Sequence, residues 1–184
     1  MIRSTIGILL LLSITLFSCD TEPPNFGGPR YDEAGNLALD RVKIEEYLET
    51  ADYDSLYRIH DPSGVVIIVQ EEGTGSRPTS NNTVYINYVG KLLDETVFDT
   101  NIESVAIEND LHDEEREYRI YPFALIPAQQ GGPITGFSIG FSRLRSGSEA
   151  VLIIPSPYAY RDQESEGIPA NSVLVFEVDF LGMD

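Results

Sequence analysis

The stretch VLIIPSPYAY at residues 151–160 decides the fold of this chain. Its first four residues have the pattern of a short hydrophobic strand, which runs into a turn rich in proline and tyrosine. A loop then leads to GIPANSVLVFEV at residues 167–178, where a second apolar strand begins at Val173. Runs of β-branched and aromatic residues bounded by proline and glycine are typical of strands that end in turns. The C-terminal part therefore predicts two strands joined by a loop.

Four more short blocks precede this stretch, and their order carries information. They are VYINYVG at 84–90, FDT at 98–100, PITGF at 133–137 and LRSGS at 144–148. Together with the C-terminal stretch they resemble, in family order, the signature of FKBP-type peptidyl-prolyl isomerases. The resemblance covers residues 55–183 and implies the FKBP-like fold.

The residue pattern by itself predicts the same class of fold. Residues 56–59 and 65–69 flank Asp61-Pro62-Ser63-Gly64, a turn sequence, and so predict a β-hairpin. Residues 83–92 alternate in the manner of a strand. Between Gly136 and Gly147, Phe137, Phe141 and Leu144 recur at helical spacing. We therefore expect an α+β domain in which a curved, mostly antiparallel sheet wraps around one short helix.

The length and the N-terminus indicate one domain behind an export signal. The chain has 184 residues, of which 42% are hydrophobic, and this suits one globular domain with a short extension. Arg3 precedes an uncharged, mostly apolar run at 6–17 that is too short to cross a bilayer comfortably. Residues 1–18 are therefore predicted to be a secretory signal peptide.

The signal ends at Cys19, the single cysteine of the chain. Leu16-Phe17-Ser18-Cys19 resembles a bacterial lipobox, which implies cleavage before Cys19 and its acylation. The alternative is an ordinary buried cysteine. Two or more acyl chains anchor a protein stably to a membrane. Asp20 and Glu22 resemble acidic sorting signals, and from them we expect a lipid-anchored protein of the bacterial cell envelope, at the outer membrane.

Composition and residue pattern also divide the chain that follows the signal peptide into three parts. Residues 19–36 contain several prolines and glycines and are predicted to be a flexible tether. Residues 37–53 are predicted to form a helical extension, with Asp40 as its cap and with Val42, Ile44, Tyr47 and Leu48 on its apolar face. The FKBP-like domain is expected to occupy residues 54–184.

The charge of the chain restricts its partners. The formal net charge is −18, which repels phosphate backbones and makes a nucleic-acid partner unfavourable, whereas basic clients are favoured. His112 lies among carboxylates in the acidic segment 102–119 and raises the alternative of a cation site. Its spacing matches no calcium loop and no Cys/His pair, so we expect a solvated loop, no metal and no cofactor.

The activity that the resemblance implies needs no nucleophile. Rotation about an X-Pro amide faces a barrier of about 18 to 20 kcal/mol, because twisting removes resonance. A catalyst must bind the twisted amide more tightly than either planar isomer. A dry aromatic pocket does this, because the twisted amide has lost much of its charge separation, and a few hydrogen bonds fix the flanking carbonyls.

The resemblance also implies which residues form the proline pocket. Phe137 stands at its floor, Asp99 at its edge, and the Tyr160 hydroxyl donates to a substrate carbonyl. The walls and rim are implied to be Tyr88, Phe98, Ile134, Phe176 and Ile168, with Phe123 as a further pocket residue and the Ile134 backbone N–H as a second donor. Taken singly, several of these residues fit the core of any sheet protein. Their joint occurrence in family order assigns them to a site for proline-containing clients and macrolide-type inhibitors.

Three departures separate the chain from the family pattern. Phe137 replaces the usual tryptophan, which reduces the aromatic area of the floor and suggests weaker activity. Arg161 replaces the glycine that normally follows the tyrosine, and the acidic segment 102–119 is longer than usual. These departures leave open a non-catalytic FKBP-fold binding or chaperone lipoprotein.

A second alternative comes from residues 136–140, GFSIG, which match the nucleophile elbow of serine hydrolases. That elbow must lie between a strand and a helix, with its histidine downstream. Both histidines, His60 and His112, precede Ser138, so the order of residues opposes a hydrolase.

Overall fold

Seven strands pair into one sheet in the order β1-β2-β6-β7-β3-β4, with β5 against β3, and every pair is antiparallel. The computed structural model describes residues 30–80, 82–125 and 133–184. The strands are β1 (Tyr57–His60), β2 (Val66–Glu71), β3 (Thr83–Lys91), β4 (Val97–Thr100), β5 (Tyr121–Ala124), β6 (Glu149–Ile154) and β7 (Leu174–Met183). The helices are α1 (Glu33–Thr50), α2 (Glu103–Glu108), α3 (Thr135–Phe141) and the 3-10 turn η1 (Ser156–Tyr158). The predicted α+β arrangement and the predicted hairpin, now β1 and β2, are confirmed.

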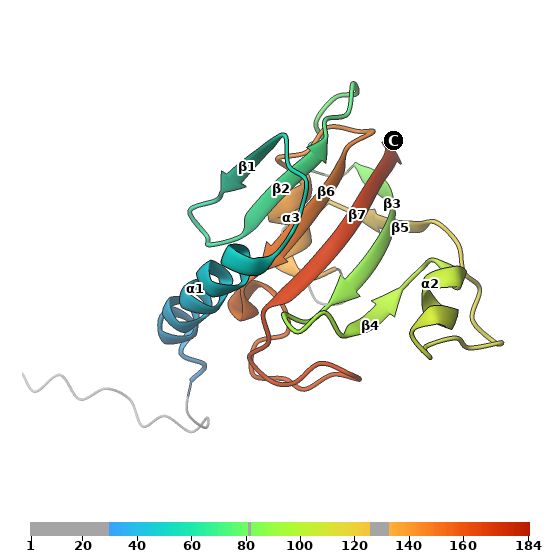
Figure 1. The fold of residues 1–184 in the computed structure, drawn as a ribbon. Coiled ribbons are helices and arrows are strands. Elements are labelled where there is room, and N and C mark those ends of the chain that lie inside the picture. The colour runs from blue at the N-terminus through green and yellow to red at the C-terminus, as the bar shows by residue number, and fades with distance from the viewer. Residues whose placement is uncertain (1–29, 81, 126–132) are drawn as a thin grey trace, which may run out of the picture. The chain divides into compact units, whose positions relative to one another are not determined.

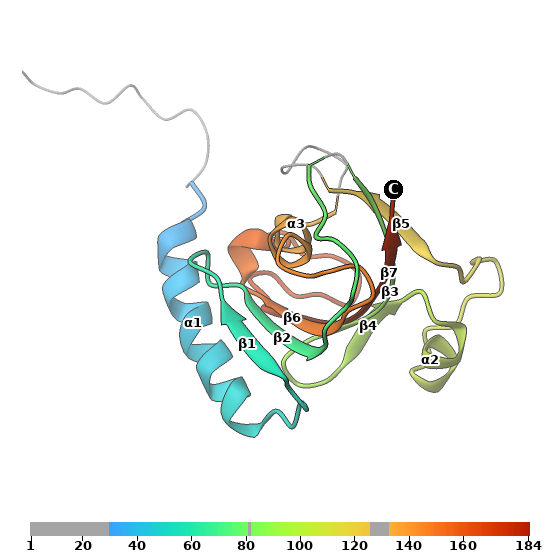
Figure 2. The same cartoon turned by 90° about the horizontal axis from the view of Figure 1, so that it is seen from above.

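The sheet is curved, with α3 in its hollow and α1 along its outer face (Figures 1 and 2). In β2, Ile67 and Val69 pack toward α3, while Val66 and Ile68 pack toward α1. Both faces of the strand are therefore buried, which explains its continuous apolar run in place of an alternating pattern. The strand β6 divides its side chains between the two faces in the same way.

Helix α3 lies very close to β6, and two glycines make this possible. A Cβ atom at Gly136 would stand 2.3 Å from a methyl of Ile154, and one at Gly140 would stand 2.7 Å from Leu152. Ser138 lies between them, inside the helix rather than at a turn between strand and helix. The two glycines that suggested a nucleophile elbow are explained by helix–sheet packing.

Helix α1 begins earlier than the sequence predicted. Its N-cap is Asp32, whose side chain accepts a hydrogen bond from the Gly35 backbone N–H at 2.9 Å. The prediction that Asp40 caps the helix is wrong, because Asp40 lies inside α1 and is 1% exposed. Ile44 and Tyr47 follow Asp40 at i+4 and i+7 and share its buried face, as a helix with one packed side requires. Val42 was predicted on the same face, but it points away from it and is 54% exposed.

The acidic segment 102–119 is also more ordered than a solvated loop. It contains α2, which packs through Ala106, a residue that is 1% exposed. The side chain of Asn101 donates to the Arg119 carbonyl at 3.0 Å and so ties the two ends of the segment together. The segment is therefore a compact insertion between β4 and β5 whose two ends are held together.

Cys19 and the predicted signal peptide lie outside the described residues. Within the described ranges, the structure has no helix with the length and apolarity that a membrane span requires.

Candidate active site

A pocket of about 200 Å³ opens at one end of the sheet, above α3. Strands β3, β4, β5 and β7, the start of α3 and the turn after η1 all contribute to it. Its lining consists of aromatic residues, one aliphatic residue, one proline and one acid: Tyr88, Phe98, Asp99, Tyr121, Pro133, Ile134, Phe137, Tyr160 and Phe176. Segments far apart in the sequence thus converge on one open, mostly aromatic concavity.

The aromatic rings support each other around a rigid floor. Phe137 is 5% exposed, and its ring centroid lies 4.7 Å from that of Phe176 in an edge-to-face arrangement. Phe176 also meets Phe98 edge to face at 5.6 Å and lies 6.1 Å from Tyr88. Edge-to-face contacts of this kind hold rings in fixed orientations. The pocket is therefore a preformed apolar cup.

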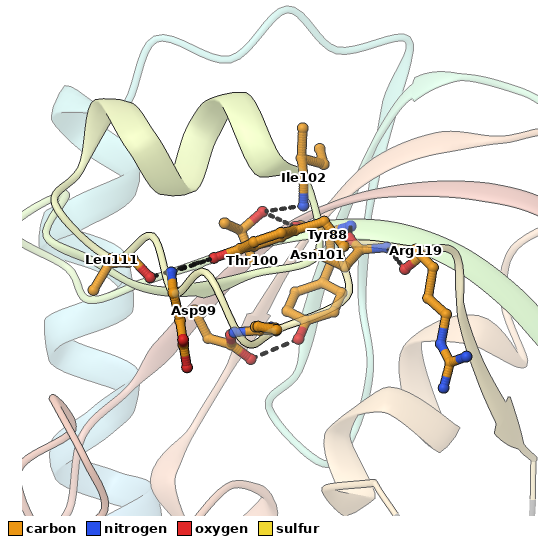
Figure 3. Close-up of polar contacts among 10 residues, drawn as sticks. Tyr88, Asp99, Thr100, Asn101, Ile102, Leu111 and Arg119 are labelled. Carbon is orange, nitrogen blue, oxygen red and sulfur yellow. Dashed lines mark hydrogen bonds and ion pairs between the residues drawn. The ribbon is translucent and has the colours of Figure 1, made fainter.

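One edge of the cup is polar, and its charges are paired. The Tyr88 hydroxyl donates to Asp99 Oδ2 at 2.5 Å, as Figure 3 shows, and Arg116 Nη1 donates to Asp99 Oδ1 at 2.8 Å. Burial, together with the hydrogen bond to the Asp99 carboxylate, raises the pKa of Tyr88 well above its ordinary value. Tyr88 therefore remains a donor and fixes the orientation of the carboxylate.

Tyr160 also lines the pocket and is 39% exposed. Within the described part of the chain, its hydroxyl has no hydrogen-bond partner. Burial of the ring and the negative charge of Asp99 raise the pKa of Tyr160 above its ordinary value. The hydroxyl is therefore protonated at neutral pH and able to donate to a ligand.

The strand that presents Asp99 is fixed by its neighbours. The Thr100 hydroxyl donates to the Tyr88 carbonyl at 2.7 Å, and the Asn101 side chain accepts from the Tyr88 N–H at 2.7 Å (Figure 3). Asn101 also donates to the Ile86 carbonyl at 3.1 Å. These buried bonds replace sheet pairing at the end of β4, so the polar edge stands on a rigid support.

A wider groove of about 670 Å³ continues from the pocket. It shares Phe98, Asp99 and Tyr160 with the pocket and runs between the acidic segment and the loop that leads to Ile168. Asp113 and Glu166, one from each side, both line it and are exposed. The concavity therefore extends beyond the pocket on at least one side.

The structure brings most of the predicted site residues together. Of that set, Ile168 lies in the groove and not in the pocket itself, and Phe123 does not line the pocket. Phe123 is 5% exposed and packs beneath the floor, 5.6 Å from Phe137 and 5.2 Å from Phe141. Its assignment to the pocket lining is therefore wrong, and it contributes to the pocket only by supporting the floor.

Sequence reasoning missed Tyr121, Arg116 and Asn101. Tyr121 occupies the position expected of Phe123, and it meets Tyr88 edge to face at 5.6 Å. The alternation of residues in β5 could have indicated Tyr121, because Tyr121 and Phe123 share one face of that strand. No local pattern marks Arg116 or Asn101.

The acidic segment forms no metal cluster among the described residues. The His112 ring stacks on Tyr118 with centroids 5.5 Å apart, and His112 Nε2 lies 3.4 Å from Glu103 Oε1. The histidine is thus part of the packing of the segment.

Comparison with known proteins agrees with this geometry. The family model described as FKBP-type peptidyl-prolyl cis-trans isomerase matches residues 75–181, more than half of the chain. The chain belongs to this family. FKBP membership accounts for the position of the pocket above α3 and for the order of the five sequence blocks.

Individual relatives cover the same FKBP region. FK506-binding protein 4 of Saccharomyces cerevisiae is 34% identical over 120 residues, which are 65% of this chain and 26% of that protein. The FKBP-type peptidyl-prolyl cis-trans isomerase FkpA of Escherichia coli is 32% identical over 119 residues, 65% of this chain and 37% of that protein. The chain therefore matches only a minor part of the length of these relatives.

Solved structures share the fold. The crystal structure of FkpA from Escherichia coli has a TM-score of 0.59 and 27% identity, covering 83% of this chain and 62% of that chain. A peptidyl-prolyl cis-trans isomerase from Pseudomonas syringae has a TM-score of 0.59 at 22% identity, covering 85% and 99%, and this supports the fold alone.

Proposed function

We propose that this protein catalyses the cis-trans isomerisation of X-Pro bonds in proteins outside the cytoplasm. The observation that carries the proposal is the open aromatic cup with two different polar groups in its lining. One is the Asp99 carboxylate, held by Tyr88 and Arg116, and the other is the Tyr160 hydroxyl, which is free to donate among the described residues. A core packed only for stability would fill this cup.

The proposed mechanism uses each part of the cup. The proline ring of the substrate sits on Phe137 between Phe98 and Phe176. The surrounding rings exclude water, which favours the twisted amide because it has less charge separation than the planar forms. The Tyr160 hydroxyl donates to a substrate carbonyl, and the Asp99 carboxylate faces the carbon of the twisting amide, which becomes more positive as resonance is lost. The residues hold and desolvate the amide, and no bond breaks.

The second candidate function is a non-catalytic binding module for proline-containing chains. The observation in its favour is Phe137, which offers less aromatic surface than the tryptophan expected in the family. Such a module would keep the cup and its affinity for a proline peptide without accelerating isomerisation.

A peptide assay separates the two functions. The full chain, purified in detergent, is mixed with a proline tetrapeptide, and the rate of cis-to-trans conversion is followed with and without a macrolide-type inhibitor. Acceleration that the macrolide suppresses and that falls in Tyr160→Phe supports the isomerase. Macrolide binding to a folded chain with no acceleration supports the binding module instead.

We also propose that the domain is lipid-anchored in a bacterial envelope, at the outer membrane, through Cys19. The support is the N-terminal sequence, with Arg3, the apolar run and the single cysteine at its end. Cells that express the chain with a clickable palmitate analogue should label it, and Cys19→Ser should lose all of the label. Equal labelling of both forms would contradict the anchor.

The groove beside the cup predicts a preference among clients. Asp113 and Glu166 stand over an apolar lining that includes Val97, Ala106 and Leu111, and a lysine or arginine has the matching apolar stem and charged end. Because both carboxylates are exposed, we expect KM for a peptide with lysine beside the proline to be about two- to fivefold lower than with glutamate. The assay compares the two peptides at low salt, where screening is weak.

The preference should disappear in Asp113→Asn/Glu166→Gln. Glu45→Gln/Glu46→Gln on the surface of α1 changes the net charge equally, away from the groove, and serves as the matched control. An unchanged preference in the groove variant would show that overall charge, and not the groove, selects the peptide.

A further inference from the structure

A buried carboxylate on α1 reaches the chain segment that carries Tyr160. Asp40 is 1% exposed, and its Oδ2 accepts from the Ser156 N–H at 2.8 Å and from the Ser156 hydroxyl at 2.5 Å. Its Oδ1 accepts from Lys43 Nζ at 2.8 Å. Placing a carboxylate in a protein interior is costly unless such bonds replace its water. Ile44 and Tyr47, on the same face of α1, pack against Val66, Ile68, Val151 and Ile153 of the sheet.

Ser156 is the base of the turn that presents Tyr160, here called the Tyr160 turn (residues 156–161). The Ser156 carbonyl accepts from the Ala159 N–H at 3.1 Å and from the Arg161 N–H at 3.0 Å. Tyr160 is thus held between two residues that are both bonded to Ser156. Whatever fixes Ser156 also fixes the backbone from which the Tyr160 ring extends into the cup.

The same turn contains Arg161, one of the departures from the family pattern. Arg161 has a φ of +58°, in the left-handed region where the glycine expected at this position is free of strain. Its guanidinium lies over the Tyr31 ring at 5.8 Å, and its Nε donates to the Pro157 carbonyl at 3.3 Å. These two contacts of the Arg161 side chain help to offset the cost of its left-handed backbone conformation.

Tyr31 joins these two sets of contacts. It directly precedes the N-cap of α1, and its hydroxyl lies 3.3 Å from the Ser156 hydroxyl, which is itself bonded to Asp40. The N-terminal helix and the arginine at the glycine position thus meet on one turn. Two features that looked unrelated in the sequence form a single structural unit.

We propose that α1 is a working part of the active site, in which Asp40 is a positioning residue that holds the Tyr160 turn from behind the cup. The inference rests on the proposed function, because it assigns α1 a role in aiming the Tyr160 hydroxyl at the substrate carbonyl. A donor that is preorganised in this way loses little entropy when it meets the twisted amide.

A double-mutant cycle tests whether Asp40 acts through Tyr160. In the full chain, Asp40→Ala should lower kcat/KM about tenfold through kcat, because a misaligned donor weakens transition-state binding. In a Tyr160→Phe background the same change should cost less than about twofold, because the group that it positions is already absent. Asp40→Asn keeps an acceptor for the Ser156 N–H and should retain more activity than Asp40→Ala. Val42→Ala, at an exposed position of α1, is the control. Equal losses in both backgrounds would overturn the proposal.

Hydrogen exchange provides a readout that does not depend on turnover. In Asp40→Ala, the Ala159 and Arg161 amides should exchange at least about tenfold faster, as expected for local opening, while the amides of β3 and β7 keep their protection. Unchanged exchange in the Tyr160 turn would overturn the proposal even if activity falls. If the wild-type chain proves inactive, the proposed function fails by itself, and the exchange result still decides whether Asp40 holds the turn.

Discussion

Replacing Asp99 with alanine is expected to lower kcat/KM for proline isomerisation by about 10- to 100-fold. Hydrogen bonds to charged groups contribute about 1.5 to 3 kcal/mol, and each 1.4 kcal/mol corresponds to a factor of ten. The variant removes the acceptor of Tyr88 and leaves the Arg116 guanidinium without its partner at the edge of the cup. The peptide assay measures the loss.

The fold should survive this change, because the Asp99 side chain is 38% exposed. Circular dichroism and the thermal midpoint check this point. Asp179→Ala, on β7 and outside the pocket lining, removes a carboxylate elsewhere on the sheet and should leave turnover unchanged. Full activity of a folded Asp99→Ala protein would remove Asp99 from the proposed mechanism.

Replacing Phe137 with alanine is expected to destabilise the domain by about 3 to 5 kcal/mol, because a buried phenyl ring is lost and a cavity remains. Three rings pack against it, those of Phe123, Phe141 and Phe176. A loss of this size is a large share of the roughly 5 to 15 kcal/mol that a typical domain has in total. Urea unfolding measures the difference in the free energy of unfolding.

Phe98→Ala is the matched comparison. Phe98 is only half-buried and forms a wall of the cup, so its loss should raise KM strongly and destabilise the domain less than Phe137→Ala. Equal destabilisation by the two changes would mean that Phe137 is not the floor on which the other rings rest.

The sheet could be predicted because the residues of each strand show by themselves which faces are buried. The run at β2 and β6 is apolar on both faces, and Asp61-Pro62-Ser63-Gly64 carries its own turn signal, with Gly64 at a φ of +95°. Helix α3 was predictable from the spacing of Phe137 and Phe141. These signals are local, so no knowledge of distant contacts is needed to interpret them.

The cap of α1 and the existence of α2 could not be predicted from neighbouring residues alone. Asp40 is a good capping residue before an apolar run, but it is buried by a bond to Ser156, 116 residues away. Asp32, the true cap, stands in a stretch whose prolines and glycines resemble a linker. In α2 the many charges suggested a loop, whereas burial of Ala106 against the fold holds a short helix in place.

At the polar edge of the site, Asp99 could be predicted from the sequence and Arg116 could not. Asp99 belongs to a motif, but Arg116 reaches it from across the acidic segment, and its position depends on how that segment folds. The register of β5 then decided between two aromatic residues. Tyr121 pairs with Ile86 and Phe123 with Val84, so Phe123 lies one pair further from Tyr88 and deeper in the core.

The position of β7 in the sheet has a consequence for biosynthesis. Strand β7, which has ten residues, lies between β6 and β3 and joins the two halves of the sheet. A ribosome or a translocation channel releases the chain N-terminus first, so β1 to β6 emerge before the strand that connects them. The core can close only after β7 has emerged. Without β7 the sheet would be divided into two halves, each with an exposed edge.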